Sequence, residues 1–93
     1  MTISERIAVN AKVYCGLIGK RISDLEKGIG VSVGYLSRVK GKAMMPIDKG
    51  YAIARWFGVS LDDLITGEAI KNCRLEKLYA EIARIEAEAK DVD

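Results

Sequence analysis

The stretch Leu25-Glu-Lys-Gly-Ile-Gly-Val-Ser-Val-Gly-Tyr-Leu-Ser-Arg-Val39 has the pattern of two short helices joined by a sharp turn. Gly30 lies where the chain must reverse direction, and glycine adopts a positive φ there without steric cost. Ser32 belongs to the residue types that cap helices, which predicts a second helix from Ser32 to Lys40. The apolar contacts that would hold the two helices together come from Leu25, Ile29, Val31, Leu36 and Val39.

Signals for a helix also occur before this stretch. The alternation of apolar and polar residues that is typical of a β-strand does not persist anywhere in the sequence. Thr2 and Glu5 have the spacing of a capping box, which predicts the start of a first helix. Gly16 and Gly19 supply stop signals near the end of that helix. These local signals predict an all-α fold.

Three more short helices are expected. Ser23 and Glu26 repeat the capping-box spacing ahead of a helix that must end at Gly28–Gly30. Pro46 is expected as an early residue of the next helix, and Ser60 caps another one. The apolar stripe of the helix after Pro46 is predicted to contain Ile47, Tyr51, Ala54 and either Trp56 or Phe57.

The chain from Glu68 to its end contains no glycine or proline, and charged residues alternate with apolar ones. The apolar residues recur at intervals of three and four, which is the spacing of a coiled-coil seam. This terminal helix is expected either to join two copies of the chain or to fold onto its own domain. The seam contains Leu75, Leu78, Ile82, Ile85, Ala89 and Val92, and the first four are the predicted dimerisation residues.

Length and composition narrow the classes of function. Ninety-three residues suffice for one domain, predicted over residues 1–67, plus the terminal helix 68–93. No apolar stretch has the length of a membrane span or of a signal peptide, so a cytoplasmic location is expected. Histidine is absent, and Cys15 and Cys73 lack metal-ligand spacing and are expected in the core. No enzyme activity, metal, cofactor or small-molecule substrate is therefore expected.

Charge is distributed unevenly along the chain. Residues 1–65 hold ten Lys and Arg against six Asp and Glu, a net charge of +4. Residues 66–93 hold five against seven, a net charge of −2. The basic residues Arg38, Lys40, Lys42 and Lys49 fall within twelve residues, which favours an anionic partner.

Four fragments in register resemble the lambda-repressor/Cro-like (Xre-type) helix-turn-helix family. They are Leu25 with Ile29-Gly-Val-Ser32, Leu36-Ser-Arg-Val39, Pro46, and Ala54-Arg-Trp-Phe-Gly-Val-Ser-Leu-Asp-Asp-Leu64. The resemblance covers residues 3–66 and implies a five-helix, lambda-repressor-like DNA-binding domain, to which this chain adds a C-terminal helix.

The sequence departs from the family pattern at three positions. Ile22 stands where the family usually has a glutamine that contacts a phosphate. Glu26 stands where alanine is preferred because the two helices cross closely, and Lys40 stands where glutamate is frequent. The first departure weakens the expected phosphate contact, the second predicts a looser or tilted helix pair, and the third favours binding to DNA.

By this resemblance, the second helix of the pair would face the major groove. Arg38 is the candidate for base specificity because its forked guanidinium can bind guanine bidentately; a phosphate contact or a solvated surface position is the alternative. The predicted base-contacting residues are Val33, Gly34, Ser37 and Arg38. The predicted phosphate-contacting residues are Arg21, Ser32, Tyr35, Lys40, Lys42 and Lys49.

The leading hypothesis is a sequence-specific regulator of transcription, a repressor that binds double-stranded DNA as a homodimer. The alternative is a protein-interaction module on the same fold, antitoxin-like or an anti-repressor, that binds DNA weakly. Ile22, Glu26 and the modest positive charge favour the alternative.

Overall fold

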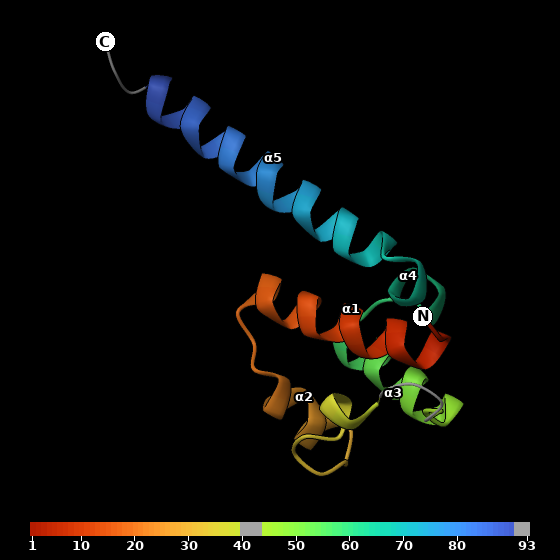
Figure 1. Ribbon diagram of the computed structural model, residues 1–93. Helices are drawn as coiled ribbons and strands as arrows, with labels where there is room; N and C mark the ends of the chain where they lie inside the picture. The colour runs from red at the N-terminus through yellow and green to blue at the C-terminus, as the bar shows by residue number, and fades with distance from the viewer. Residues whose placement is uncertain (40–43, 91–93) are drawn as a thin grey trace.

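A computed structural model describes residues 1–39 and 44–90 of the chain. The described residues form helices joined by turns and irregular segments, with no strand among them, so the all-α prediction is confirmed. In chain order the elements are α1 (Ile3–Ile18), α2 (Ile22–Gly28), the 3-10 helix η1 (Leu36–Arg38), α3 (Ile47–Phe57), α4 (Leu61–Thr66) and α5 (Glu68–Lys90). All elements except α5 form a compact head, and α5 extends from it (Figure 1).

The predicted capping box begins α1. The Thr2 hydroxyl accepts a hydrogen bond from the Glu5 amide at 3.1 Å, and the Glu5 carboxylate accepts from the Thr2 amide at 3.2 Å. Gly19 ends the helix in the left-handed conformation, with φ 69°. Gly16 was wrongly predicted as a stop, because it lies inside α1 and the helix continues to Ile18.

The helix α2 begins earlier than the sequence suggested. Arg21 is its N-cap residue, in extended conformation, and makes no side-chain capping hydrogen bond. The predicted capping box of Ser23 and Glu26 is wrong, because Ser23 is already inside the helix and the Glu26 carboxylate binds elsewhere. The spacing of that pair was therefore coincidental.

The end signals of α3 and α4 are confirmed, except that Pro46 precedes α3 and is not one of its first residues. Pro46 is the N-cap residue of α3, one position before the helix, and Gly58 ends it with φ 74°. The Ser60 hydroxyl accepts from the Asp63 amide at 3.1 Å and caps α4, which Gly67 ends.

The apolar stripe predicted for α3 is partly wrong. Ile47 and Tyr51 are 69% and 48% exposed, whereas Gly50, Ile53 and Ala54 face the core. Gly50 lies on the buried face, where an added Cβ would be in van der Waals contact with the Ile7 side chain at 3.4 Å. The small residue, and not the large ones, marks the buried face.

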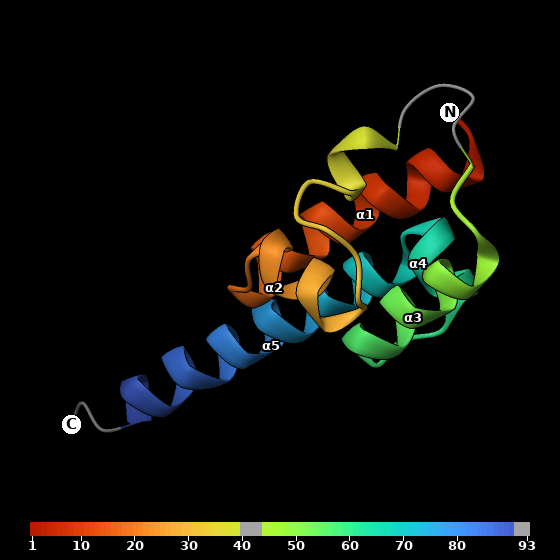
Figure 2. The ribbon, with the colours of Figure 1, turned by 90° about the horizontal axis from the view of Figure 1, so that it is seen from below.

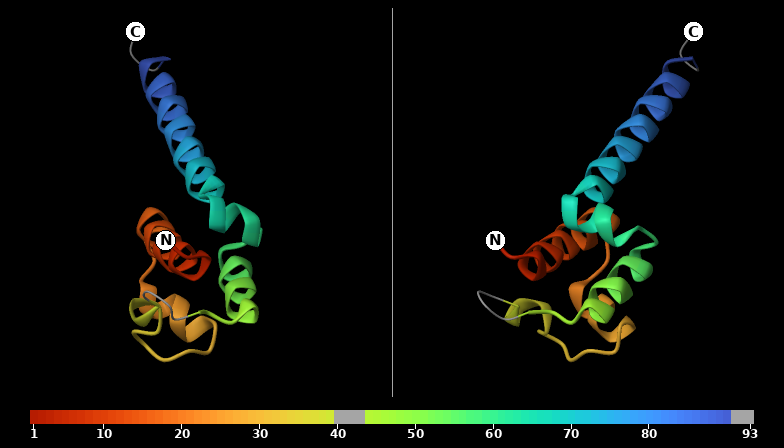
Figure 3. Two further views of the ribbon diagram at one scale, coloured as in Figure 1. Left: turned by 45° about the vertical axis from the view of Figure 1, so that its right-hand side comes forward. Right: turned by 90° about the vertical axis from the view of Figure 1, so that its right-hand side faces the viewer.

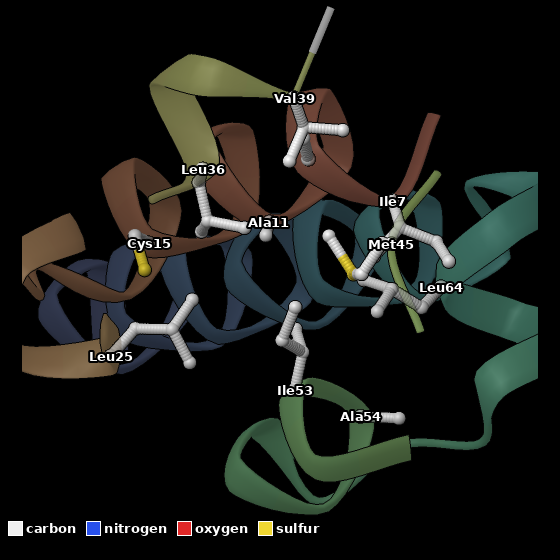
Figure 4. Packing of buried hydrophobic residues seen from close by; sticks show 11 residues of the cluster. Ile7, Ala11, Cys15, Leu25, Leu36, Val39, Met45, Ile53, Ala54 and Leu64 are labelled. Carbon is white, nitrogen blue, oxygen red and sulfur yellow. The ribbon is translucent and has the colours of Figure 1, made fainter. Parts of the chain in front are cut away.

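A single apolar core joins the elements of the head (Figure 4). Leu25 of α2, Leu36 of η1, Ile53 of α3 and Leu64 of α4 are at most 1% exposed. Helix α1 lies against all of them and contributes Ile7, Ala8, Ala11 and Cys15.

Two long-range hydrogen bonds fix α1 relative to later elements. The Asn10 amide donates to the carbonyl oxygens of Leu64 and Ile65, at 2.7 and 3.2 Å, and so binds the C-terminal end of α4. The buried Ser4 hydroxyl accepts from the Met45 amide at 2.8 Å. Neither contact had a signal in the sequence.

Helix α5 gives the molecule its elongated shape, 60 × 23 × 19 Å. Only its first turns pack on the head, where Ala69, Ile70 and Cys73 are buried against α1 and α4. The remainder projects from the head in every view (Figures 1 and 3). None of the described helices is both long and apolar enough to cross a membrane.

The two cysteines lie in the core, as predicted. Both are buried free thiols, and Cys15 is 1% exposed. Burial, with a smaller contribution from the Asp24 carboxylate, raises the pKa of the Cys15 thiol. A raised pKa keeps this thiol protonated and unreactive at neutral pH.

Candidate nucleic-acid interface

The site predicted from the sequence lies at the end of the head opposite the free end of α5. Helix α2, the segment 29–35 and η1 form this end together (Figures 1 and 3). Figure 2 looks onto it from below. We refer to residues 20–38 at this end as the α2–η1 segment.

The helix predicted from Ser32 to Lys40 is not formed. Residues 33–35 form a turn, and the 3-10 helix η1 contains only Leu36–Arg38. Gly34 has φ +92°, a conformation that an α-helix cannot contain. The positive φ at Gly34 therefore delays the start of helical structure to Leu36. Lys40 lies outside the described residues.

Glu26 determines the shape of this turn. Its side chain is 1% exposed, and its two carboxylate oxygens accept from the backbone amides of Gly34 and Leu36, at 3.1 and 3.0 Å. Backbone donors next to a short helix are otherwise left without partners, and a carboxylate satisfies them strongly. Glu26 thus does for η1 what Ser32 was predicted to do for a longer helix.

This role of Glu26 was not found from the sequence. The departure from the family's alanine predicted a looser helix pair, but the carboxylate binds the following segment directly. The available signal was an acidic residue at a position that α2 turns inward, next to Leu25. Such a residue must have hydrogen-bond donors nearby, because an unpaired buried charge is very costly.

The predicted capping residue Ser32 has a different partner. Its hydroxyl accepts from a guanidinium nitrogen of Arg38 at 2.8 Å, so Arg38 bends back across the turn. Both residues are exposed. A side chain that replaced the Gly34 hydrogen would approach the Arg38 guanidinium, with a Cβ at 3.1 Å.

The predicted base-contacting residues lie on the turn and on η1, which follows it directly. Val33 is 58% exposed, Ser37 and Arg38 are exposed, and Gly34 is half-buried. The turn brings these residues together, although not on the α-helix that was expected. Val33 and Ser37 offer a methyl-bearing and a hydroxyl side chain to an approaching surface.

The predicted phosphate-contacting residues are more dispersed. Arg21 is exposed at the start of α2, and Ser32 is on the turn. Tyr35 is half-buried and packs against the core. Lys49 lies in the first turn of a different element, α3, and is half-buried. Lys42, like Lys40, is outside the described residues.

The surface of the α2–η1 segment is positive. Asp24 is its one exposed acidic residue, since Glu26 is buried. Four cations, Lys20, Arg21, Lys27 and Arg38, are exposed on it. Lys20, like Arg21, could supply the phosphate contact that Ile22 weakens, whereas Lys27 was not predicted as a DNA contact.

Helix α2 is held close to α3 by its last residue. A Cβ on Gly28 would clash with the indole ring of Trp56, so the two helices approach closely at this point. Trp56 in turn makes an edge contact with Phe57, with ring centroids 5.3 Å apart. The base of the α2–η1 segment is therefore rigidly connected to the core.

Comparison with known proteins gives no relative: no family model, curated protein or solved structure matches the chain. Among residues 1–39 and 44–90, no cluster of Cys, Asp or Glu could hold a metal ion.

Proposed function

We propose that the chain is a DNA-binding regulator of transcription, a dimeric repressor whose head has a lambda-repressor-like fold. One observation carries the proposal: the α2–η1 segment has four exposed cations, and the exposed side chains of Val33 and Ser37 lie on the same segment. The order of helices and the turn after α2 support the fold assignment.

In this proposal the cations and the turn have separate roles. Lys20, Arg21 and Lys27 lie on or next to α2 and bind backbone phosphates, which positions the head without selecting a sequence. The turn and η1 enter the major groove in place of a full recognition helix. Arg38 supplies the base contact, and it must exchange its Ser32 partner for a guanine edge to do so.

The first test is binding of the full chain to mixed duplex DNA, measured by fluorescence anisotropy over a salt series. The logarithm of affinity is expected to fall linearly with the logarithm of salt, with a slope of about −0.9 for each phosphate bound. The double reversal Lys20→Glu/Arg21→Glu is expected to abolish binding. The matched control Lys77→Glu/Lys90→Glu makes the same change of charge on the exposed side of α5 and should leave binding within twofold. No binding of the unaltered chain at low salt would overturn the proposal.

The second test separates base recognition from phosphate contact. Sites selected from a random DNA pool provide the specific target. Arg38→Ala is expected to lose about 1–3 kcal/mol on the selected site, and much less on unrelated DNA. An equal loss on both would assign Arg38 to the phosphates.

A second candidate function is a protein-interaction module. It is favoured by the short η1, by the hydrogen bond that occupies Arg38, and by an apolar groove of about 380 Å³ on another face. Ile3, Met44 and Ile47 on the groove are 64%, 86% and 69% exposed, which is unusual for large apolar side chains. Failure of DNA binding together with intact folding would favour this function.

A further inference from the structure

The outer part of α5 has no partner among residues 1–39 and 44–90. Every residue from Arg74 to Lys90 is exposed. In proteins most of the stability of a helix comes from the packing of its apolar face, so an exposed apolar face on α5 favours a further contact. The large apolar seam residues Leu75, Leu78, Ile82 and Ile85 are 39%, 51%, 42% and 53% exposed.

The seam does not point toward the head. At 3.6 residues per turn, it lies about 150° around the helix from Ala69, Ile70 and Cys73, which pack on the head. Helix α5 therefore uses one face, at its start, for its own head, and presents nearly the opposite face outward. The sequence allowed this helix either to join two copies of the chain or to fold onto its own domain, and the two contacts would use different faces. A second helix can therefore reach the seam without displacing the head.

The residues flanking the seam on its two sides carry different charges. One flank contains Arg74, Glu81 and Glu88, and the other contains Asn72, Tyr79 and Glu86. In paired helices these flanking residues set partner choice and orientation. The Arg84 guanidinium lies 3.8 Å from Glu81 on the same helix, away from the seam.

A parallel pair of identical helices suits these charges poorly. In a parallel pair each residue of the Arg74 flank meets a residue of the opposite flank on the other helix, five positions further along the sequence. Arg74 then faces Tyr79 of the second copy, and Glu81 faces Glu86 of the second copy. The second contact occurs twice, once on each side, so two carboxylate pairs repel each other.

An antiparallel pair suits them better, because each flank then meets the same flank of the other helix in reverse order. Arg74 faces Glu88 of the second copy, twice, and Glu81 faces its own counterpart once. On the other side the two Tyr79 rings face each other. The seam residues pair as Leu75 with Ile85 and Leu78 with Ile82, so all four large apolar residues are covered.

We infer that α5 binds a second copy of this chain through the Leu75–Ile85 seam in antiparallel orientation. The inference deepens the dimer of the proposed function but does not depend on DNA binding. The two heads then lie at opposite ends of the helix pair. Residue 71 of one copy lies opposite residue 89 of the other, so the two attachment points are about 27 Å apart along the axis at 1.5 Å per residue.

The orientation can be tested by disulfide formation in the full-length chain. Tagged Leu78→Cys is mixed with untagged Ile82→Cys under mild oxidation, and a mixed disulfide is expected to dominate. Each variant alone should form few links. Self-linked Leu78→Cys or Ile82→Cys would indicate a parallel pair and overturn the inference. The unaltered chain, with its buried Cys15 and Cys73, is the control and should not form links.

Charge reversal gives an independent test, measured as the dimer dissociation constant by sedimentation. Glu88→Lys is expected to weaken the dimer by about threefold to tenfold, because two attractive pairs become repulsive. Addition of Arg74→Glu should restore it to within twofold. Glu81→Lys should leave the dissociation constant within twofold, because residue 81 faces its own counterpart and the pair stays like-charged. In a parallel dimer the new lysine would face Glu86 of the second copy, and the dimer would become tighter.

The outcomes separate this inference from the proposed function. A chain that is monomeric in sedimentation at all concentrations overturns the inference, whether or not it binds DNA. A chain that forms the mixed disulfide but does not bind DNA supports the inference and contradicts the proposed function. Far-ultraviolet circular dichroism of each variant checks that the head remains folded.

Discussion

Replacement of Glu26 by alanine is the most informative single change in the head. Alanine is preferred at this position in the family that the sequence resembles, so the family pattern alone would predict no loss of stability. In this structure it leaves the Gly34 and Leu36 amides without their acceptor. It also removes a side chain that is 1% exposed.

The expected loss follows from two opposing contributions. Each hydrogen bond to a charged acceptor contributes about 1.5–3 kcal/mol, so two contribute about 3–6 kcal/mol. Removal of a buried carboxylate recovers part of its desolvation cost. We expect a net decrease in the free energy of unfolding of about 2–4 kcal/mol. Glu26→Gln preserves volume and one acceptor oxygen, and should lose about 1–2 kcal/mol.

Urea unfolding monitored by Trp56 provides the measurement. Trp56 is the one tryptophan of the chain and lies against Gly28, so its fluorescence reports on the head. Asp24→Ala, an exposed acidic residue of the same helix, is the matched control and should lose at most about 0.5 kcal/mol. If Glu26→Ala were no more destabilising than Asp24→Ala, the carboxylate would not hold the turn and the reasoning would fail.

Three further predictions concern other parts of the head. Gly34→Ala should lower the free energy of unfolding by about 1–2 kcal/mol, because Gly34 has a positive φ. If an α-helix instead began at Ser32, the same change should raise it by about 1 kcal/mol. The sign of the change, measured by urea unfolding, therefore distinguishes the two structures. Gly28→Ala should destabilise by about 1–3 kcal/mol through contact with Trp56, and a blue or red shift of its fluorescence should accompany the loss; unchanged stability and spectrum would mean that the two helices are farther apart. Burial is the main cause that raises the pKa of both Cys15 and Tyr14, so the folded chain holds these protons more tightly than the unfolded chain. The urea midpoint should therefore fall as pH rises above about 8.5, less so in Cys15→Ala/Tyr14→Phe; equal pH profiles for the two chains would contradict the assignment.

The helix boundaries were largely predictable because their causes are local. A cap such as Thr2 or Ser60 acts on an amide three residues away, and Gly19 or Gly58 acts through its own φ. For these caps the sequence within one turn of the chain contains the information that places the helix end. Ser23 illustrates the limit, because the same spacing occurs inside a helix without any capping contact.

The structure of residues 32–38 was not predictable in this way. Leu36 and Val39 are both buried, as expected, but a turn followed by a 3-10 helix buries them as well as an α-helix would. The choice between the turn and an α-helix depends on the Glu26 carboxylate, which lies eight residues before Gly34 and ten before Leu36. The same applies to the face of α3, where the large residues Ile47 and Tyr51 are exposed and the small residue Gly50 is buried.

The Glu26 contact has a consequence for protein engineering. A common way to change the target of a DNA-binding head is to transplant the segment that touches the bases into another scaffold. In this chain residues 32–38 would be that segment under the proposed function, and their shape is specified from outside them, by a side chain on the preceding helix. A graft of residues 32–38 alone would lose the carboxylate that binds its backbone amides, so Glu26 has to be transferred together with these residues.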